Sequence, residues 1–120
     1  MRDPTRGGAA TALNEFIENS DLGIELDERL LPIDAGVSAA CDALGLEPLY
    51  CANEGKLLAV ADPKHARQVL SALQALPGGE NARVIGQVSD RYPGRVTIKT
   101  LAGGARILQK LTGAQLPRIC

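Results

Sequence analysis

The last five residues of the chain, 116–120 (Leu-Pro-Arg-Ile-Cys), place a thiol at the terminus, where it can act as a nucleophile or carry a transferred group. Pro117 discourages a helix from running to the end and Gly113 adds a second break, so residues 112–120 are predicted to form a movable arm. Nine extended residues reach roughly 30 Å, far enough to visit a site built elsewhere. The alternative, which position alone favours, is a frayed end with an incidental thiol at Cys120.

The other two cysteines, Cys41 and Cys51, bring the total to three at wide spacings, which fits neither a disulfide framework nor a zinc site. Cys41 falls in a helical pattern and Cys51 lies beside a predicted strand, so both are expected to be small buried hydrophobic residues. Only Cys120 is expected to react. Reduced thiols and the lack of a signal-peptide pattern predict a cytoplasmic protein.

Glu54 is a second candidate for chemistry. It lies in the polar turn 53–56 (Asn-Glu-Gly-Lys) between two short apolar stretches, 49–53 and 57–61, that are predicted to be strands. Catalytic groups are often displayed at strand ends, so Glu54 is a candidate base, although a solvated turn carboxylate is the more common case.

The N-terminal segment 1–8 (Met-Arg-Asp-Pro-Thr-Arg-Gly-Gly) leads directly into a helical pattern. A loop that ends in glycines at a helix N-terminus suits a phosphate, because unpaired backbone N–H groups and the helix dipole both favour an anion. An ordinary helix cap, with Asp3 or Thr5 bonded to the first turn, is an equally good interpretation.

Composition narrows the possible partners. With 13 basic and 14 acidic residues, a net charge of -1 and 2% aromatic residues, the chain offers neither a basic surface nor stacking platforms for nucleic acid. Its apolar runs fall well short of the roughly twenty residues that cross a bilayer, so no membrane partner is expected. One histidine, His65, cannot build a metal site, and none is predicted.

Hydrophobic periodicity and turn signals predict the elements that must hold these residues. The predicted helices cover 9–18, 35–44 and a third beginning at Asp62 and Pro63; the predicted strands cover 22–26, 49–53, 57–61, 83–89 and 95–100; and 105–111 is predicted to be a short helical turn. The third helix has a predicted buried stripe of Ala66, Val69, Leu70 and Leu73. This order indicates an α+β fold: a single domain over 1–111 with a mixed β-sheet covered on one face by helices, and a flexible C-terminal tail over 112–120.

Four stretches together resemble one protein family. They are 1–8 (Met-Arg-Asp-Pro-Thr-Arg-Gly-Gly), 23–26 (Gly-Ile-Glu-Leu), 52–57 (Ala-Asn-Glu-Gly-Lys-Leu) and 116–120 (Leu-Pro-Arg-Ile-Cys). Taken in this order, the chain resembles the C-terminal domain of the HypE family of hydrogenase maturation factors, which is related to aminoimidazole ribonucleotide synthetase and selenophosphate synthetase. The resemblance covers essentially the whole chain.

The resemblance implies an unusual reaction at the terminal thiol. In that family the last cysteine receives a carbamoyl group from a HypF-like carbamoyltransferase, and ATP-dependent dehydration converts the thiocarboxamide to a thiocyanate. The cyano group then passes to iron on a HypC-HypD-like complex and becomes a cyanide ligand of a [NiFe]-hydrogenase. The resemblance makes Cys120 the carrier and Glu54 the candidate general base, while Lys56 either orients a phosphate or holds Glu54.

The resemblance also implies nucleotide-side residues, which are Asp3, Thr5, Arg6, Gly7 and Gly8. Members of the family carry an N-terminal domain with magnesium-binding aspartates and most of the ATP pocket, and the sequence does not include it. ATP and magnesium are therefore expected in a full-length protein, and neither is expected to be held tightly by these 120 residues.

Two functions are consistent with this resemblance. The first is the tail-bearing part of an ATP-dependent S-carbamoyl-cysteine dehydratase, whose activity in the isolated chain is uncertain. The second is a non-catalytic carrier or docking module that presents its tail to maturation partners. A homodimer is a further possibility.

Overall fold

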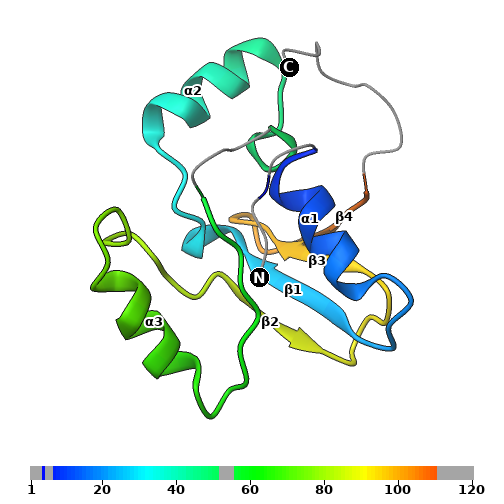
Figure 1. The fold of residues 1–120 in the computed structure, drawn as a ribbon. Helices are drawn as coiled ribbons and strands as arrows, with labels where there is room; N and C mark the ends of the chain where they lie inside the picture. Colours follow the sequence, from blue (N-terminus) through cyan, green and yellow to red (C-terminus); the bar gives the residue numbers. More distant parts are fainter. Residues whose placement is uncertain (1–3, 5–6, 52–55, 111–120) are drawn as a thin grey trace.

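The computed structural model describes residue 4, residues 7–51 and residues 56–110 of the chain. In order, its elements are α1 (Gly8–Ile17), β1 (Gly23–Asp27), the short 3-10 helix η1 (Glu28–Leu30), α2 (Ala35–Leu44), the short 3-10 helix η2 (Pro48–Tyr50), α3 (Ala66–Gln74), β2 (Gly86–Ser89), β3 (Val96–Lys99) and β4 (Ala105–Leu108). Figure 1 shows α1 lying over the sheet, with α2 at the top and α3 at the lower left. None of the helices in these ranges is long and apolar enough to cross a membrane.

The four strands form one mixed sheet in the order β2-β1-β3-β4. β1 runs antiparallel to β2 and parallel to β3, and β3 runs antiparallel to β4. This confirms the predicted α+β class and its mixed sheet. The predicted strands 22–26, 83–89 and 95–100 correspond to β1, β2 and β3.

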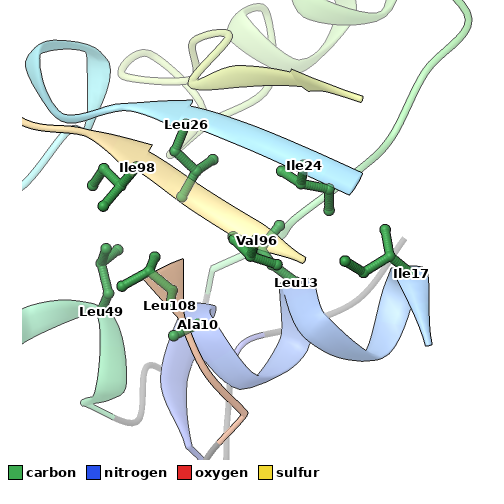
Figure 2. Close-up of a cluster of buried hydrophobic side chains, with 9 residues drawn as sticks. All are labelled: Ala10, Leu13, Ile17, Ile24, Leu26, Leu49, Val96, Ile98 and Leu108. Carbon is green, nitrogen blue, oxygen red and sulfur yellow. The ribbon is translucent and has the colours of Figure 1, made fainter. Parts of the chain in front are cut away.

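The core lies between one face of this sheet and α1. Side chains alternate between the two faces of a strand, so the register of Ile24 with Val96 and of Leu26 with Ile98 brings these four residues onto the same face. Figure 2 shows them packed against α1, β4 and η2, in a buried cluster of Ala10, Leu13, Ile17, Ile24, Leu26, Leu49, Val96, Ile98 and Leu108.

The opposite face of the sheet is polar. Glu25 and Thr97 are register partners there, and the Ser89 hydroxyl donates a hydrogen bond to Glu25 Oε2 at 2.7 Å. α1 therefore covers one face of the sheet, in agreement with the predicted sheet that helices cover on one face.

The predicted helical turn over 105–111 is wrong. Residues Ala105–Leu108 form β4, in which Leu108 pairs with Val96 and Arg106 pairs with Ile98. A short apolar run does not distinguish a strand from a helical turn by periodicity. Pairing with the edge of β3, which the local sequence does not encode, determines the outcome.

The predicted strands at 49–53 and 57–61 are also not formed as expected. Pro48–Tyr50 is the 3-10 helix η2, because proline at its first position already has the helical φ angle. Residues 52–55 lie outside the described part of the chain. In 57–61, Leu58 makes an isolated bridge and its neighbours have no regular structure.

The helix predicted from Asp62 begins later, at Ala66. Asp62 Oδ1 accepts a hydrogen bond from the Lys64 N–H at 2.8 Å, so it caps a turn that precedes the helix. The expected stripe occupies the half-buried positions of α3, but no residue of α3 is buried. By contrast, the predicted bounds of α2 are confirmed, with Asp34 capping Gly36 and Gly45 ending the helix at φ 69°.

Candidate functional site

Residues in or next to three predicted site stretches meet around η2. These stretches are the N-terminal segment, the turn that contains Glu54 and the terminal arm. η2 is held in this position by Leu49, which is buried in the core cluster at 7% exposure. The contacts that join each stretch to η2 define the candidate site.

The start of α1 packs directly against η2. Gly7 and Gly8 both have positive φ angles, 76° and 67°, a conformation that favours glycine. A Cβ on Gly8 would lie 2.5 Å from the Leu49 carbonyl oxygen and 2.6 Å from that of Cys51. Close packing thus explains glycine at position 8 without any bound nucleotide, and it fixes where segment 1–8 meets the fold.

β4 is tied to the same short helix. The Tyr50 hydroxyl donates a hydrogen bond to the backbone carbonyl of Gln109 at 2.7 Å. Just before η2, Glu47 accepts a hydrogen bond from Arg106 Nη2 at 2.8 Å, within an ion pair. These two bonds connect η2 to the residues that lead into 111–120.

Lys110, the last described residue of the chain, lies beside α1. Its Nζ is 3.7 Å from Glu15 Oε1 and 3.5 Å from Glu18 Oε1. Asn14 connects α1 with the end of β4, because its side-chain amide donates to the carbonyls of Ala10 and Leu108 at 2.8 and 2.9 Å. An open groove of about 340 Å³ here includes Asn14, Arg95 and Lys110 in its lining.

The predicted site residues divide into two groups. Gly8 is buried, Gly7 is half-buried and Lys56 is exposed. Asp3, Thr5, Arg6, Glu54 and Cys120 lie outside the described residues. The structure therefore brings together the residues that flank the predicted stretches. The reactive side chains of Glu54 and Cys120 lie outside the described residues.

Sequence reasoning missed the residues that join these flanks. The contacts of Tyr50 with Gln109 and of Glu47 with Arg106 each span 59 positions, and no local pattern reports them. The sequence offers one signal for these contacts, which is Tyr50 itself. A tyrosine that packs against a core usually places its hydroxyl in a hydrogen bond.

Cys51 departs from its predicted environment. It follows η2 rather than lying beside a strand, and it is half-buried. Burial raises the pKa of the Cys51 thiol, and contact with Cys41 and the charge of Glu47 raise it further. A thiol whose pKa is raised is a poor nucleophile at neutral pH, so Cys51 is a poor candidate for a reactive cysteine.

Magnesium and ATP are the cofactors that the resemblance implies. Within residue 4, 7–51 and 56–110, no group of three or more His, Cys, Asp or Glu side chains could hold a metal ion, so a magnesium site does not fit them. A helix start offers backbone N–H donors to a phosphate, but Gly8 at the start of α1 packs on η2. The side of Gly8 that faces η2 is therefore filled by protein.

Comparison with known proteins gives close and extensive matches. The family model described as "AIR synthase related protein, C-terminal domain" matches residues 1–99. "Carbamoyl dehydratase HypE" of Bradyrhizobium diazoefficiens is 50% identical over 120 residues, which is all of this chain and 35% of that protein. The protein of the same name from Cupriavidus necator is 48% identical, with all of this chain and 34% of that protein covered.

Solved structures agree with these sequence matches. "Crystal Structure of Hydrogenase Maturation Protein HypE in complex with ATP" has a TM-score of 0.89 and 42% identity, covering 99% of this chain and 37% of that one. "Crystal structure of HypE-HypF complex" has a TM-score of 0.83 and 39% identity, covering 90% of this chain and 35% of that one. The chain thus spans about a third of the length of the relatives it matches. The chain belongs to the family of AIR synthase related proteins, C-terminal domain.

Proposed function

We propose that this chain is the C-terminal part of a [NiFe]-hydrogenase maturation protein that carries a carbamoyl group on Cys120. In the full-length protein, that group is dehydrated with ATP to a thiocyanate, which supplies a cyanide ligand. The observation that carries this proposal is 50% identity to a carbamoyl dehydratase HypE over all 120 residues, a span that ends at Cys120 of this chain.

The proposed chemistry has two steps at one sulfur. The Cys120 thiolate first accepts the carbamoyl group and becomes a thiocarboxamide. The amide oxygen then takes the γ-phosphoryl group of ATP, which makes it a good leaving group. One nitrogen proton leaves as the oxygen is phosphorylated, with release of ADP, and loss of phosphate with the second nitrogen proton gives the thiocyanate and inorganic phosphate.

Glu54 is the proposed base for a nitrogen proton, and a placed base typically contributes about a hundredfold to ten-thousandfold. Its segment follows directly from Cys51 at the end of η2, and Tyr50 is bonded to Gln109 near the start of the arm. This arrangement supports a meeting of Glu54 with the arm, because both stretches begin beside the same short helix. Lys56 is proposed to orient a phosphate or to hold Glu54.

The proposed nucleotide-side residues are Asp3, Thr5, Arg6, Gly7 and Gly8. A similar structure described as a HypE complex with ATP supports ATP as the co-substrate of the full-length protein. The proposal also includes magnesium in the full-length protein. Its ligands would lie outside the described part of this chain, because the described residues contain no suitable cluster of side chains.

The proposed partner in the loading step is a HypF-like carbamoyltransferase, which a similar structure of a HypE-HypF complex supports. A HypC-HypD-like complex would receive the cyano group on iron. A homodimer and a cytoplasmic location complete the proposal, the latter because the thiol carrier requires a reducing compartment.

A second candidate is a non-catalytic carrier or docking module. Coverage of only 35% of the relative's length favours this for the chain by itself. Nucleotide binding separates the two functions: magnesium-dependent ATP binding by the 120-residue chain would support a catalytic contribution. Binding of the carbamoyltransferase without binding of ATP would support the carrier.

The proposal is tested by replacing Cys120 with alanine in the full-length protein. Cys120→Ala is expected to abolish carbamoyl loading and hydrogenase maturation, because no other group carries the transferred carbon. Cys51→Ala is the matched control and should still be loaded. Cyanide ligands formed by the Cys120→Ala protein, detected by infrared spectroscopy of the hydrogenase, would overturn the proposal.

A further inference from the structure

Tyr50 joins two segments that are 59 positions apart in the chain. Its hydroxyl donates a hydrogen bond to the backbone carbonyl of Gln109 at 2.7 Å. The side chain of Tyr50 is half-buried and packs against the core cluster, in which its neighbour Leu49 is buried. The hydroxyl is therefore presented from a position that the core fixes.

Gln109 depends on such a contact because the sheet does not hold it. The pairing of β4 with β3 ends at Leu108, opposite Val96. Gln109 and Lys110, which follow, are exposed and have no regular structure. Their position is therefore set by side-chain contacts.

Lys110 makes the other such contact, and it is the weaker one. Its Nζ lies 3.5 Å from Glu18 Oε1 and 3.7 Å from Glu15 Oε1, and the Lys110 side chain is 40% exposed. Exposed ion pairs contribute little, because water and salt screen the charges and long side chains lose conformational freedom. A short hydrogen bond from a side chain that packs on the core contributes more. Tyr50 is therefore the main attachment of the chain that leads into 111–120.

Tyr50 is also close in sequence to the proposed base. Glu54 is four positions after Tyr50, and Cys120 is eleven positions after Gln109. The bond between Tyr50 and Gln109 thus gives a short path through the molecule from Glu54 to Cys120. Bringing the ends of a segment together costs less conformational entropy when the segment is short.

We propose, on the basis of the proposed function, that Tyr50 is a positioning residue for the dehydration step. Its bond to Gln109 fixes where the arm leaves the fold relative to the segment that contains Glu54. Tyr50 takes part in no bond that is made or broken. It raises the fraction of molecules in which the carbamoyl group on Cys120 meets Glu54. Loading by a separate carbamoyltransferase does not require that meeting, so loss of the hydroxyl should slow dehydration and spare loading.

The test uses the full-length protein with Tyr50→Phe, which keeps the ring and removes the bonding oxygen. Tyr92→Phe is the matched control, because Tyr92 is the other tyrosine of the chain and lies between β2 and β3 with 43% exposure. The carbamoyl-loaded proteins are mixed with magnesium and ATP, and the loss of one water from the carbamoyl group is followed by mass spectrometry over a single turnover.

Tyr50→Phe should dehydrate its carbamoyl group about two- to tenfold more slowly at saturating ATP, the range expected for one neutral hydrogen bond. The ATP concentration that gives half the maximal rate and the rate of loading by the carbamoyltransferase should both be unchanged. A general disturbance of the fold would change these two quantities as well. Tyr92→Phe should match the wild-type protein in all three measurements.

An unchanged dehydration rate in Tyr50→Phe would overturn this role of Tyr50. So would an equal loss in loading and dehydration, or a loss that higher ATP concentrations abolish. These results leave the proposed function intact, because the wild-type protein still dehydrates its carbamoyl group. If the loaded wild-type protein lost no water, the proposed function itself would be contradicted, together with the role of Tyr50.

Discussion

Asp27 and Arg29 form a close ion pair where β1 meets η1, with Arg29 Nη2 2.7 Å from Asp27 Oδ2. Arg29 also donates its backbone N–H to Asp27 Oδ1 at 3.0 Å. The side-chain and backbone hydrogen bonds from Arg29 lower the pKa of Asp27 from 3.8 to about 2. The pair therefore stabilises the turn that carries the chain out of the central strand.

The pH dependence follows from the sign of this shift. Because the folded pKa lies below the unfolded value of 3.8, the contribution of Asp27 is fully present above that pH and is lost as the pH falls through about 2. Carbon-detected NMR should show the Asp27 carboxyl titrating near 2. In Arg29→Gln its pKa should rise toward 3.8, and an unchanged value would contradict the assignment to Arg29.

The three cysteines differ in their environments, and their spacing in the sequence does not show this difference. Cys41 and Cys51 were expected to be inert hydrophobic residues, and burial at Cys41 confirms half of that interpretation. The partial exposure of Cys51 could not be predicted, because it depends on how η2 packs in the fold. Cys120 stays a predicted carrier on the strength of the family resemblance.

At the scale of elements, the junction of α1 with η2 organises the candidate site. Gly8→Ala should lower the free energy of unfolding by at least about 2 kcal/mol, because it adds strain at positive φ and a Cβ against the carbonyls of Leu49 and Cys51. Urea denaturation of the 120-residue chain measures this change.

Gly45→Ala is the matched control, because Gly45 has φ 69° and a Cβ added there would meet nothing within 4 Å. It should cost about 1 kcal/mol, the conformational part alone. Equal losses in the two variants would mean that packing against η2 contributes nothing beyond the backbone conformation.

Several elements were predictable because their signals are local. The predicted range of α2, 35–44, matches the structure, in which Asp34 caps the helix and Gly45 ends it. β4 was missed for the opposite reason, because it depends on pairing with β3. The start of η2 at Pro48 is local, but its position depends on Leu49 in the core and on the bonds of Tyr50 to Gln109 and of Glu47 to Arg106. The candidate site depends on those same long-range contacts. The sequence could therefore suggest candidate residues, but it could not show which of them lie close together.

At the scale of the whole molecule, stability rests on a core with one helical layer. Ile98→Ala should destabilise the chain by about 2–5 kcal/mol, because Ile98 has no exposed surface and truncation leaves a cavity between β3 and α1. Ile107→Ala, on the polar face with 47% exposure, should change stability by no more than about 0.5 kcal/mol. Thermal unfolding followed by circular dichroism distinguishes them, and a similar loss in both would contradict the one-sided core.

α2 and α3 stand outside this core. No residue of α3 is buried, and Leu44 at the end of α2 is 72% exposed. The amphipathic pattern of α3 correctly identified which residues face inward, but not how far they are covered. The relatives that this chain matches are about three times longer, and activity is accordingly proposed for the full-length protein.

The most direct test of the central proposal is the mass of the C-terminal peptide from the full-length protein after carbamoyl loading. Incubation with magnesium and ATP should remove one water from the carbamoyl group on Cys120, and Glu54→Gln should load normally but retain that water. ATP hydrolysis with the carbamoyl mass unchanged on Cys120, or loading at a different residue, would contradict a carbamoyl dehydratase that works through its terminal thiol.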